Sequence, residues 1–280
     1  MRGAGMRGMV LIAVLWLVAA LSILVSGMAS SVRGEARLLS QARQRAVAGG
    51  VGDAAIHLVL QQMVVRPEPL SRMVFVDTVY HGTPVRVQVM PLNGLIDLNT
   101  AELPLLAQLF AVAGGLPRQA ADALAQAAVE TRQLRTPQGD TQNFEAPEDL
   151  LRVPGVDYML YAKVAPLVVA GERGSGRVNP LAAPVSVLSV LAGGDVGTAT
   201  RIASSRDAGQ VGVDTTGLGA GFLDNGGAQA IRLDAQVPLA DGGWLHVSRS
   251  VSLNRSVRDG MPWRTFKTEY GFEGVPRKTS

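Results

Sequence analysis

Residues 9–32 read MVLIAVLWLVAALSILVSGMASSV, a run of 24 residues without a single charge. A helix rises about 1.5 Å per residue, so roughly twenty apolar residues span the hydrocarbon core of a membrane, which is about 30 Å thick. The run therefore predicts an N-terminal membrane helix. The eight residues in front of it, MRGAGMRG, contain two arginines and no acid. Arginines also follow the run, so the positive-inside bias does not decide its orientation: Arg33, Arg37, Arg43 and Arg45.

Three kinds of N-terminal segment agree with this run. A secretory signal peptide would need an apolar core of about 7–15 residues; the run is longer, although residues 29–31 (Ala-Ser-Ser) make a passable cleavage site. An unprocessed membrane anchor is the simplest alternative. The third is suggested by Gly8, which stands between the basic leader and the apolar run. This junction resembles a type IV prepilin leader, which prepilin peptidase would cut after Gly8 to leave Met9 as the first mature residue.

The helix is expected to continue beyond the apolar run. Residues 33–63 contain no proline, whereas Pro67 would end a helix. Apolar residues recur there at steps of three to five, which is typical of one helix face: Leu38, Ala42, Ala46, Val51, Ala55, Leu58 and Met63. The pattern predicts a helix of about 55 residues, half in lipid and half packed on a globular domain. A group of glycines marks a bend or a close contact: Gly49, Gly50 and Gly52.

Two groups of β-type segments flank the centre of the chain. Residues 73–89 alternate β-branched and polar residues around residues 81–84 (His-Gly-Thr-Pro), and they predict a hairpin. Near the C-terminus, residues 230–239 and 244–255 flank a second turn, Ala-Asp-Gly-Gly, and residues 263–272 suggest a last strand. Four or five antiparallel strands packed on the second half of the long helix predict an α+β fold.

A helical block, residues 95–206, lies between the two strand groups. It contains a faint internal repeat. An asparagine precedes a helix in each half, Asn99 and Asn179, and each half ends in a helix that carries an arginine, Arg132 and Arg206. Residues 99–102 (Asn-Thr-Ala-Glu) resemble an N-terminal cap of the helix that follows them.

The turn at residues 153–156, Val-Pro-Gly-Val, looks like a helix-hairpin-helix, a motif that often binds the nucleic-acid backbone. Charge argues against that role. Residues 93–208 contain nine Arg and Lys against twelve Asp and Glu, a net charge of −3, and Asp157 follows the turn. A phosphate-binding surface should be basic. We therefore expect this turn to pack two helices and not to bind nucleic acid.

The sequence also argues against catalysis. The chain has no cysteine, which excludes thiol nucleophiles and cysteine-ligated zinc or iron–sulfur sites. Its three histidines, His57, His81 and His246, lie far apart and lack metal-ligand spacing. No nucleophile-elbow, phosphate-loop or dinucleotide-binding motif is present. We expect a protein that is not an enzyme and that has no cofactor.

Two segments within this order of elements carry a family resemblance. Residues 94–101 (GLIDLNTA) and 150–156 (LLRVPGV), behind a prepilin-like leader, resemble the K-type minor pseudopilins of type II secretion systems (general secretion pathway protein K). The likeness covers nearly the whole chain. Most pseudopilins have a glutamate at the fifth mature position, whereas K-type members are apolar there, and this chain has Ala13. The chain departs from the family at residues 90–93, where Met-Pro-Leu-Asn replaces an acidic pair, and near Arg132, where a tryptophan motif is missing.

The resemblance implies a pseudopilin fold in five segments: a leader (1–8), a spine helix (9–65, with 9–32 in the membrane), a first part of the β domain (66–93), an all-helical insertion (94–208) and a second part of the β domain (209–280). It implies an assembly protein of the bacterial inner membrane, with one span and its C-terminal domain in the periplasm. Such a protein would initiate and cap the pseudopilus for export across the outer membrane. The implied partners are the I-type and J-type minor pseudopilins, prepilin peptidase and the inner-membrane secretion platform, and the mature N-terminus would be methylated.

The resemblance also suggests individual site residues. The spine-helix residues expected to meet partner helices are Ala13, Leu38, Ala42 and Ala46. Because calcium sites are reported across the family, the glycine-rich residues 217–227 with Asp214 and Asp224 form a candidate calcium loop. Two carboxylates are few for a cation that takes six to eight oxygens, and a mobile loop is the alternative.

A function of another class remains open at this point. A membrane-anchored periplasmic DNA receptor of the competence type, with helix-hairpin-helix repeats, would share the anchor and the Asn-Thr-Ala helix start. It would not explain the two β hairpins or the acidic helical block.

Overall fold

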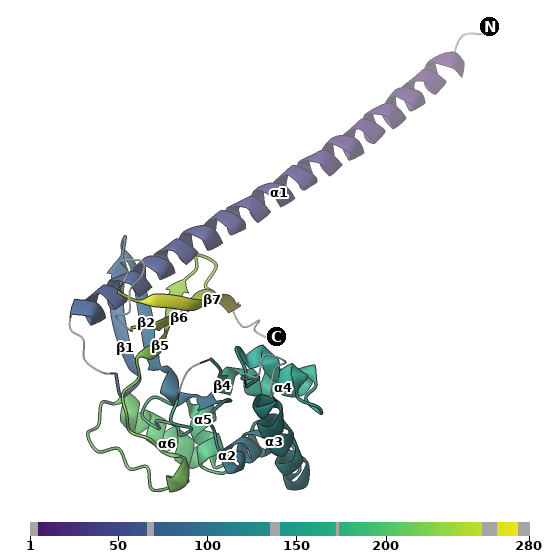
Figure 1. The fold of residues 1–280 in the computed structure, drawn as a ribbon. Coiled ribbons are helices and arrows are strands. Elements are labelled where there is room, and N and C mark those ends of the chain that lie inside the picture. The colour runs from purple at the N-terminus through teal and green to yellow at the C-terminus, as the bar shows by residue number, and fades with distance from the viewer. Residues whose placement is uncertain (1–4, 66–69, 135–140, 172–173, 254–261, 274–280) are drawn as a thin grey trace.

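A single long helix, α1 (Gly5–Val65), projects from a body of sheet and helices (Figure 1). The computed structural model describes residues 5–65, 70–134, 141–171, 174–253 and 262–273. Within α1, side chains are described at residues 14–22 and 38–65, so much of the predicted membrane segment 9–32 lies outside them. The helix ends two residues before Pro67, which confirms the predicted end. Over the described residues, none of the helices is both long enough and apolar enough to cross a membrane.

Five antiparallel strands form one sheet against which the second half of α1 lies, which confirms the predicted α+β class (Figure 1). The strand order is β1-β2-β5-β6-β7. The strands are β1 (Val74–Tyr80), β2 (Thr83–Pro91), β5 (Ala230–Pro238), β6 (Trp244–Ser252) and β7 (Arg264–Glu273). In the register of β2 on β5, Val87 lies opposite Ala235. This pairing joins the two predicted strand groups across the whole insertion.

The face of α1 that meets the sheet follows three- and four-residue steps. Its buried apolar residues are Ala48, Ala55, Ile56, Val59 and Leu60. They pack against inward-facing residues of the sheet: Val85, Val87, Val89, Ile231, Leu233, Leu245 and Val247. Leu58, which the predicted stripe includes, is 37% exposed instead. The five-residue steps of that stripe carry it around the helix, whereas steps of three and four stay on one face.

Gly52 lets α1 approach the sheet closely, which is one of the two expectations for the glycine group. A Cβ atom at Gly52 would lie 2.6 Å from Cγ2 of Val247 and 3.2 Å from Cγ2 of Val237. Gly50 lies on the exposed side of the same helix, and a Cβ atom there would have nothing within 4 Å.

The insertion between β2 and β5 has its own core and, over the described residues, five α-helices. These are α2 (Leu103–Val112), α3 (Arg118–Gln133), α4 (Tyr158–Val164), α5 (Val185–Leu191) and α6 (Val196–Asp207). Short 3-10 helices are η1 (Leu92–Gly94), η2 (Pro147–Arg152), η3 (Ala165–Leu167) and η4 (Ala220–Phe222). The prediction of an all-helical insertion is wrong, because β3 (Ile96–Asp97) pairs in parallel with β4 (Val168–Val169). Both strands are buried, and their pairing satisfies backbone groups that water cannot reach.

The core of the insertion extends past its predicted boundary. Leu218 is buried in it and Phe222 packs against it, although both belong to the segment 209–280 that was expected to form the second part of the β domain. The chain therefore rejoins the sheet only at β5, which begins at Ala230, and not at residue 209 as predicted.

Asp97 and Asn99 hold the turn before α2. The N-cap residue of α2 is Glu102, the last residue of the predicted capping segment 99–102, and it makes no side-chain hydrogen bond. Asn99 binds the backbone of Phe144 instead: its Nδ2 donates to the carbonyl at 2.8 Å and its Oδ1 accepts from the N–H at 2.8 Å. Asp97 organises the turn, because its carboxylate accepts from the Thr100 hydroxyl at 2.8 Å. The Asn99 side chain thus pairs with a residue 45 positions away along the chain and does not cap α2.

Candidate assembly surface

The part of α1 that leaves the sheet forms a free shaft, residues 38–47, and every residue of it is exposed. Leu38 is 68% exposed and Val47 is 60% exposed. Three of the predicted partner residues lie on the free shaft, where another helix can reach them: Leu38, Ala42 and Ala46. The other predicted residues of this segment have side chains outside the described residues: Gly8, Met9 and Ala13. The partner contacts themselves stay a prediction.

One flank of α1 is fastened to β6 and β7. The Asp53 carboxylate forms an ion pair with Arg249, whose Nη2 lies at 2.8 Å, and it accepts hydrogen bonds from Arg249 Nε at 3.1 Å and from the Tyr270 hydroxyl at 3.2 Å. On the free shaft itself, the Arg45 guanidinium lies 4.8 Å from the centre of the Phe272 ring, a cation–π contact. These contacts hold the direction in which the shaft leaves the sheet.

The opposite flank of α1 is open and bounds a groove of about 410 Å³, which we call the shaft groove. Its other walls are the start of β2 at Thr83 and the end of β5 with the turn that follows. Its apolar lining includes Val47, Val51, Val237, Pro238 and Leu239, and Arg43 is the one charged residue among the described residues that line it. A hollow of about 290 Å³ adjoins the groove, with which it shares Ser40, Gln44 and Ala240, and it is lined by Asp241 as well.

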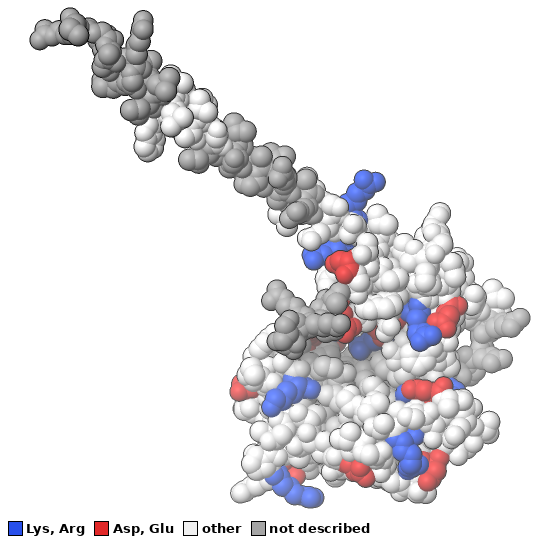
Figure 2. All heavy atoms as spheres, turned by 180° about the vertical axis from the view of Figure 1, so that it is seen from behind, with Lys and Arg blue, Asp and Glu red and all other residues white. Residues whose placement is uncertain are grey.

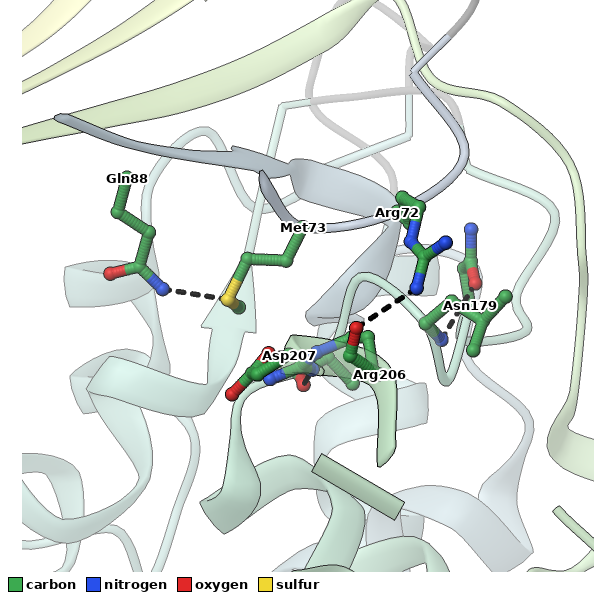
Figure 3. Close-up of polar contacts among 8 residues, drawn as sticks. Arg72, Met73, Gln88, Asn179, Arg206 and Asp207 are labelled. Carbon is green, nitrogen blue, oxygen red and sulfur yellow. Dashed lines mark hydrogen bonds and ion pairs between the residues drawn. The ribbon is translucent and has the colours of Figure 1, made fainter. Parts of the chain in front are cut away.

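Polar contacts fasten the insertion to the sheet domain (Figure 3). Arg72, which precedes β1, donates Nη2 to the carbonyl of Arg206 near the end of α6 at 2.9 Å. Asn179 is completely buried, and its Nδ2 donates to the carbonyl of Ser71 at 2.6 Å. Arg72 and Arg206 are 134 positions apart, so no local pattern of the sequence indicated Arg72.

The internal repeat has a structural counterpart in two helix pairs, α2–α3 and α5–α6. Arg132 on α3 donates Nη1 to the carbonyls of Leu98 at 2.7 Å and Ala101 at 2.9 Å, which precede α2. Arg206 on α6 donates Nη1 to the carbonyl of Ala183, which precedes α5. In each pair, an arginine of the second helix thus donates to backbone carbonyl groups of residues that precede the first helix in the sequence. A hydrogen bond to a charged group is worth about 1.5–3 kcal/mol, so these arginines hold each pair closed.

The helix-hairpin-helix-like turn is not arranged for phosphate. The Asp157 carboxylate accepts from the N–H of Leu160 at 2.7 Å, so an anion already occupies the N-terminus of α4. The residues that follow are apolar and exposed, Tyr158 and Met159 at 70% each. Figure 2 shows Lys and Arg interspersed with Asp and Glu over the described part of the face that it draws. This geometry does not favour the DNA-receptor alternative.

The two predicted calcium ligands are each engaged in a local turn. Hydrogen bonds from the N–H and hydroxyl of Thr216 lower the pKa of Asp214, and Arg201 lies 3.7 Å from the same carboxylate. Hydrogen bonds from the Ser175 hydroxyl and the N–H of Gly226 lower the pKa of Asp224. Within the part of the chain that the structure describes, no three His, Cys, Asp or Glu residues gather as a metal site would require. Calcium binding stays a prediction.

The sheet face opposite α1 is polar. Asp234 of β5 lies on this face, opposite Ser248 of β6, since its neighbours Leu233 and Ala235 point into the core beneath α1. Burial raises the pKa of the Asp234 carboxyl above its ordinary value of 3.8, and the hydrogen bond with Ser248 offsets part of the rise.

Comparison with solved structures identifies the fold. A chain in the crystal structure of the GspK–GspI–GspJ complex, from the type 2 secretion system of enterotoxigenic Escherichia coli, is similar to this one. The match has a TM-score of 0.51 and 14% sequence identity, and it covers 85% of this chain and 99% of the other. The chain has a GspK-like fold. This confirms the fold that residues 94–101 and 150–156 implied.

At 14% identity the likeness to GspK concerns the fold alone. No family model matches the sequence, and no curated protein matches it.

Proposed function

We propose that this chain is a minor pseudopilin of a type II secretion system, an assembly protein and not an enzyme. The observation that carries the proposal is the GspK-like fold, matched over 85% of this chain and 99% of the other. Two features of the molecule support it. The free shaft offers exposed apolar residues to other helices, and the insertion lies at the end of the body away from the N-terminus of α1 (Figure 1).

The proposed partners are I-type and J-type minor pseudopilins, since the similar chain was solved in a complex of GspK with GspI and GspJ. The test is to co-express the full chain with both partners, extract the proteins in detergent and measure co-purification. Leu38→Asp on the free shaft should weaken the complex, because a carboxylate would have to be buried against an apolar partner helix. Val211→Asp is the matched control, since Val211 is 98% exposed in the loop after α6. A wild-type chain that elutes alone would contradict the proposal.

We propose further that the chain is anchored in the bacterial inner membrane by residues 9–32, with the C-terminal domain in the periplasm and contact to the inner-membrane secretion platform. Prepilin peptidase would cut after Gly8, and Met9 would become the methylated N-terminus. Mass spectrometry of the mature protein tests this. An intact leader, or a start near Val32, would contradict it, whereas Gly8→Leu should block cleavage by crowding the peptidase site.

We place the protein at the tip of the pseudopilus, where it would initiate and cap the fibre. The support is the insertion, which would obstruct a subunit stacked above it, and Ala13. In a fibre, a glutamate at this position would pair with the N-terminal amine of a neighbour, and a tip subunit has no such neighbour above it.

The tip position is tested by Ala13→Glu in a strain that lacks the native protein. An unpaired carboxylate near mid-membrane costs about 2.5–3.5 kcal/mol on insertion scales, and less near a helix end, so the change should bring no gain in export. Longer fibres with this subunit distributed along them would refute the tip position.

A further inference from the structure

We infer that the shaft groove receives a helix of a neighbouring pseudopilin whose apolar ridge is flanked by a carboxylate that faces Arg43 and a cation that faces Asp241. The inference rests on the proposed function and specifies one of its contacts. It concerns the open flank of α1 and not the flank that Arg45 and Asp53 fasten to β7.

The shape and lining of the groove fit a helix. Along α1 the groove extends from Ser40 to Val51, a length of about 17 Å at the rise of a helix, or three turns. Its walls carry valines of α1 and of β5, and Val47 is 60% exposed although it borders this apolar surface. Helices pack at interaxial distances of about 8–10 Å by placing ridges of side chains into such grooves. Val237 and Leu239 on one wall and the valines of α1 on the other thus leave room for the side-chain ridge of another helix.

The charges along the groove specify the helix that fits. Arg43 is the one charged residue that lines the groove, and Asp241 is the one that lines its continuation, among the described residues there. A complementary helix would therefore present a carboxylate and a cation at these two places, with apolar residues between them. Complementary charges select the partner and its register, while the apolar contact supplies most of the burial.

A membrane surface is the less favoured occupant. Anionic lipid attracts clusters of several Lys and Arg, whereas this groove pairs one cation with one anion. Arg45, the other arginine of the free shaft, is held over Phe272 on the opposite flank and does not line the groove.

The test compares two charge reversals, one in the groove and one outside it. Arg43→Glu and Arg118→Glu make the same change in net charge, each at an exposed residue of a helix, so both variants should fold like the wild type. The affinity of the full-length chain for each partner pseudopilin is measured in detergent. Arg43→Glu and Val47→Asp should each weaken binding to one partner about tenfold or more, because a like charge or an unpaired carboxylate would be buried in the contact. Arg118→Glu, on α3 and outside the groove, should change that affinity by less than about threefold.

The outcomes separate this inference from the proposed function. Recovery of Arg43→Glu binding by an acid-to-lysine change in the partner helix would establish the pairing. If the wild type binds its partners and Arg43→Glu leaves the affinity unchanged, the inference fails and the proposed function stands. The same holds if both charge reversals weaken binding equally. A wild-type chain that binds neither partner would overturn both. Weaker binding of Arg43→Glu to vesicles containing phosphatidylglycerol, with unchanged partner affinity, would assign the groove to the membrane and overturn the inference.

Discussion

Two glycines on α1 should respond in opposite directions to the same substitution. In the interior of a helix, alanine is preferred over glycine by about 1 kcal/mol. Gly50→Ala should realise this gain, because the new Cβ would have nothing within 4 Å. Gly52→Ala should not, because its Cβ would lie 2.6 Å from Cγ2 and 3.1 Å from Cβ of Val247, which is completely buried in the sheet.

The size of the effect at Gly52 follows from this overlap. Val247 is β-branched and packed on all sides, so it cannot move away, and the helix has to shift off the sheet instead. Overpacking of this kind costs about 1–3 kcal/mol. After the helix-propensity gain of about 1 kcal/mol, Gly52→Ala should be destabilising by up to about 2 kcal/mol. The two variants should therefore differ by about 1–3 kcal/mol in the free energy of unfolding.

The measurement is urea unfolding of the full-length chain in detergent, followed by tryptophan fluorescence. Trp263 reports on the contact between α1 and the sheet, since its ring lies 6.0 Å from that of His57 on α1. Hydrogen exchange of residues 48–60 gives an independent measure of the same contact. If Gly52→Ala stabilises the protein as much as Gly50→Ala does, the close approach of α1 to β6 is not a packing constraint and the reasoning fails.

Two other substitutions probe the polar groups. Because burial raises the pKa of Asp234 above 3.8, the folded protein holds this proton more tightly than the unfolded chain, and stability falls as the pH rises through the folded-state pKa. Asp234→Asn should remove that fall, so its advantage in unfolding free energy should grow between about pH 3 and pH 7, and a difference independent of pH would count against this. Arg132→Leu should open the α2–α3 pair and accelerate hydrogen exchange in α2, at a loss of about 1.5–3 kcal/mol for each lost hydrogen bond from its charged group. Arg45→Ala, outside the insertion, is its control and should leave α2 unchanged.

The sequence by itself was sufficient to predict those helices and strands whose residue pattern repeats over a short distance. The apolar run 9–32, the absence of proline up to Pro67 and apolar residues at steps of three to five predicted one long helix, and α1 ends where expected. Alternation in residues 73–89 predicted the β1–β2 hairpin, whose turn at residues 81–82 lies within the predicted 81–84. Such periods reflect local backbone geometry, which each segment carries without reference to the rest of the chain. Short motifs within residues 94–101 and 150–156 indicated the GspK-like fold.

Only the tertiary structure showed which segments far apart in the sequence contact one another. The pairing of β2 with β5, the parallel pairing of β3 with β4, and the contact of Asn99 with Phe144 each depend on residues that local patterns do not relate. The candidate assembly surface likewise has one part that the sequence predicted and one part that it did not. Its exposed residues on the free shaft were predictable from spacing along one helix. The shaft groove was not, because its second wall is built by the end of β5, about 190 residues further along, which only the folded sheet brings beside α1.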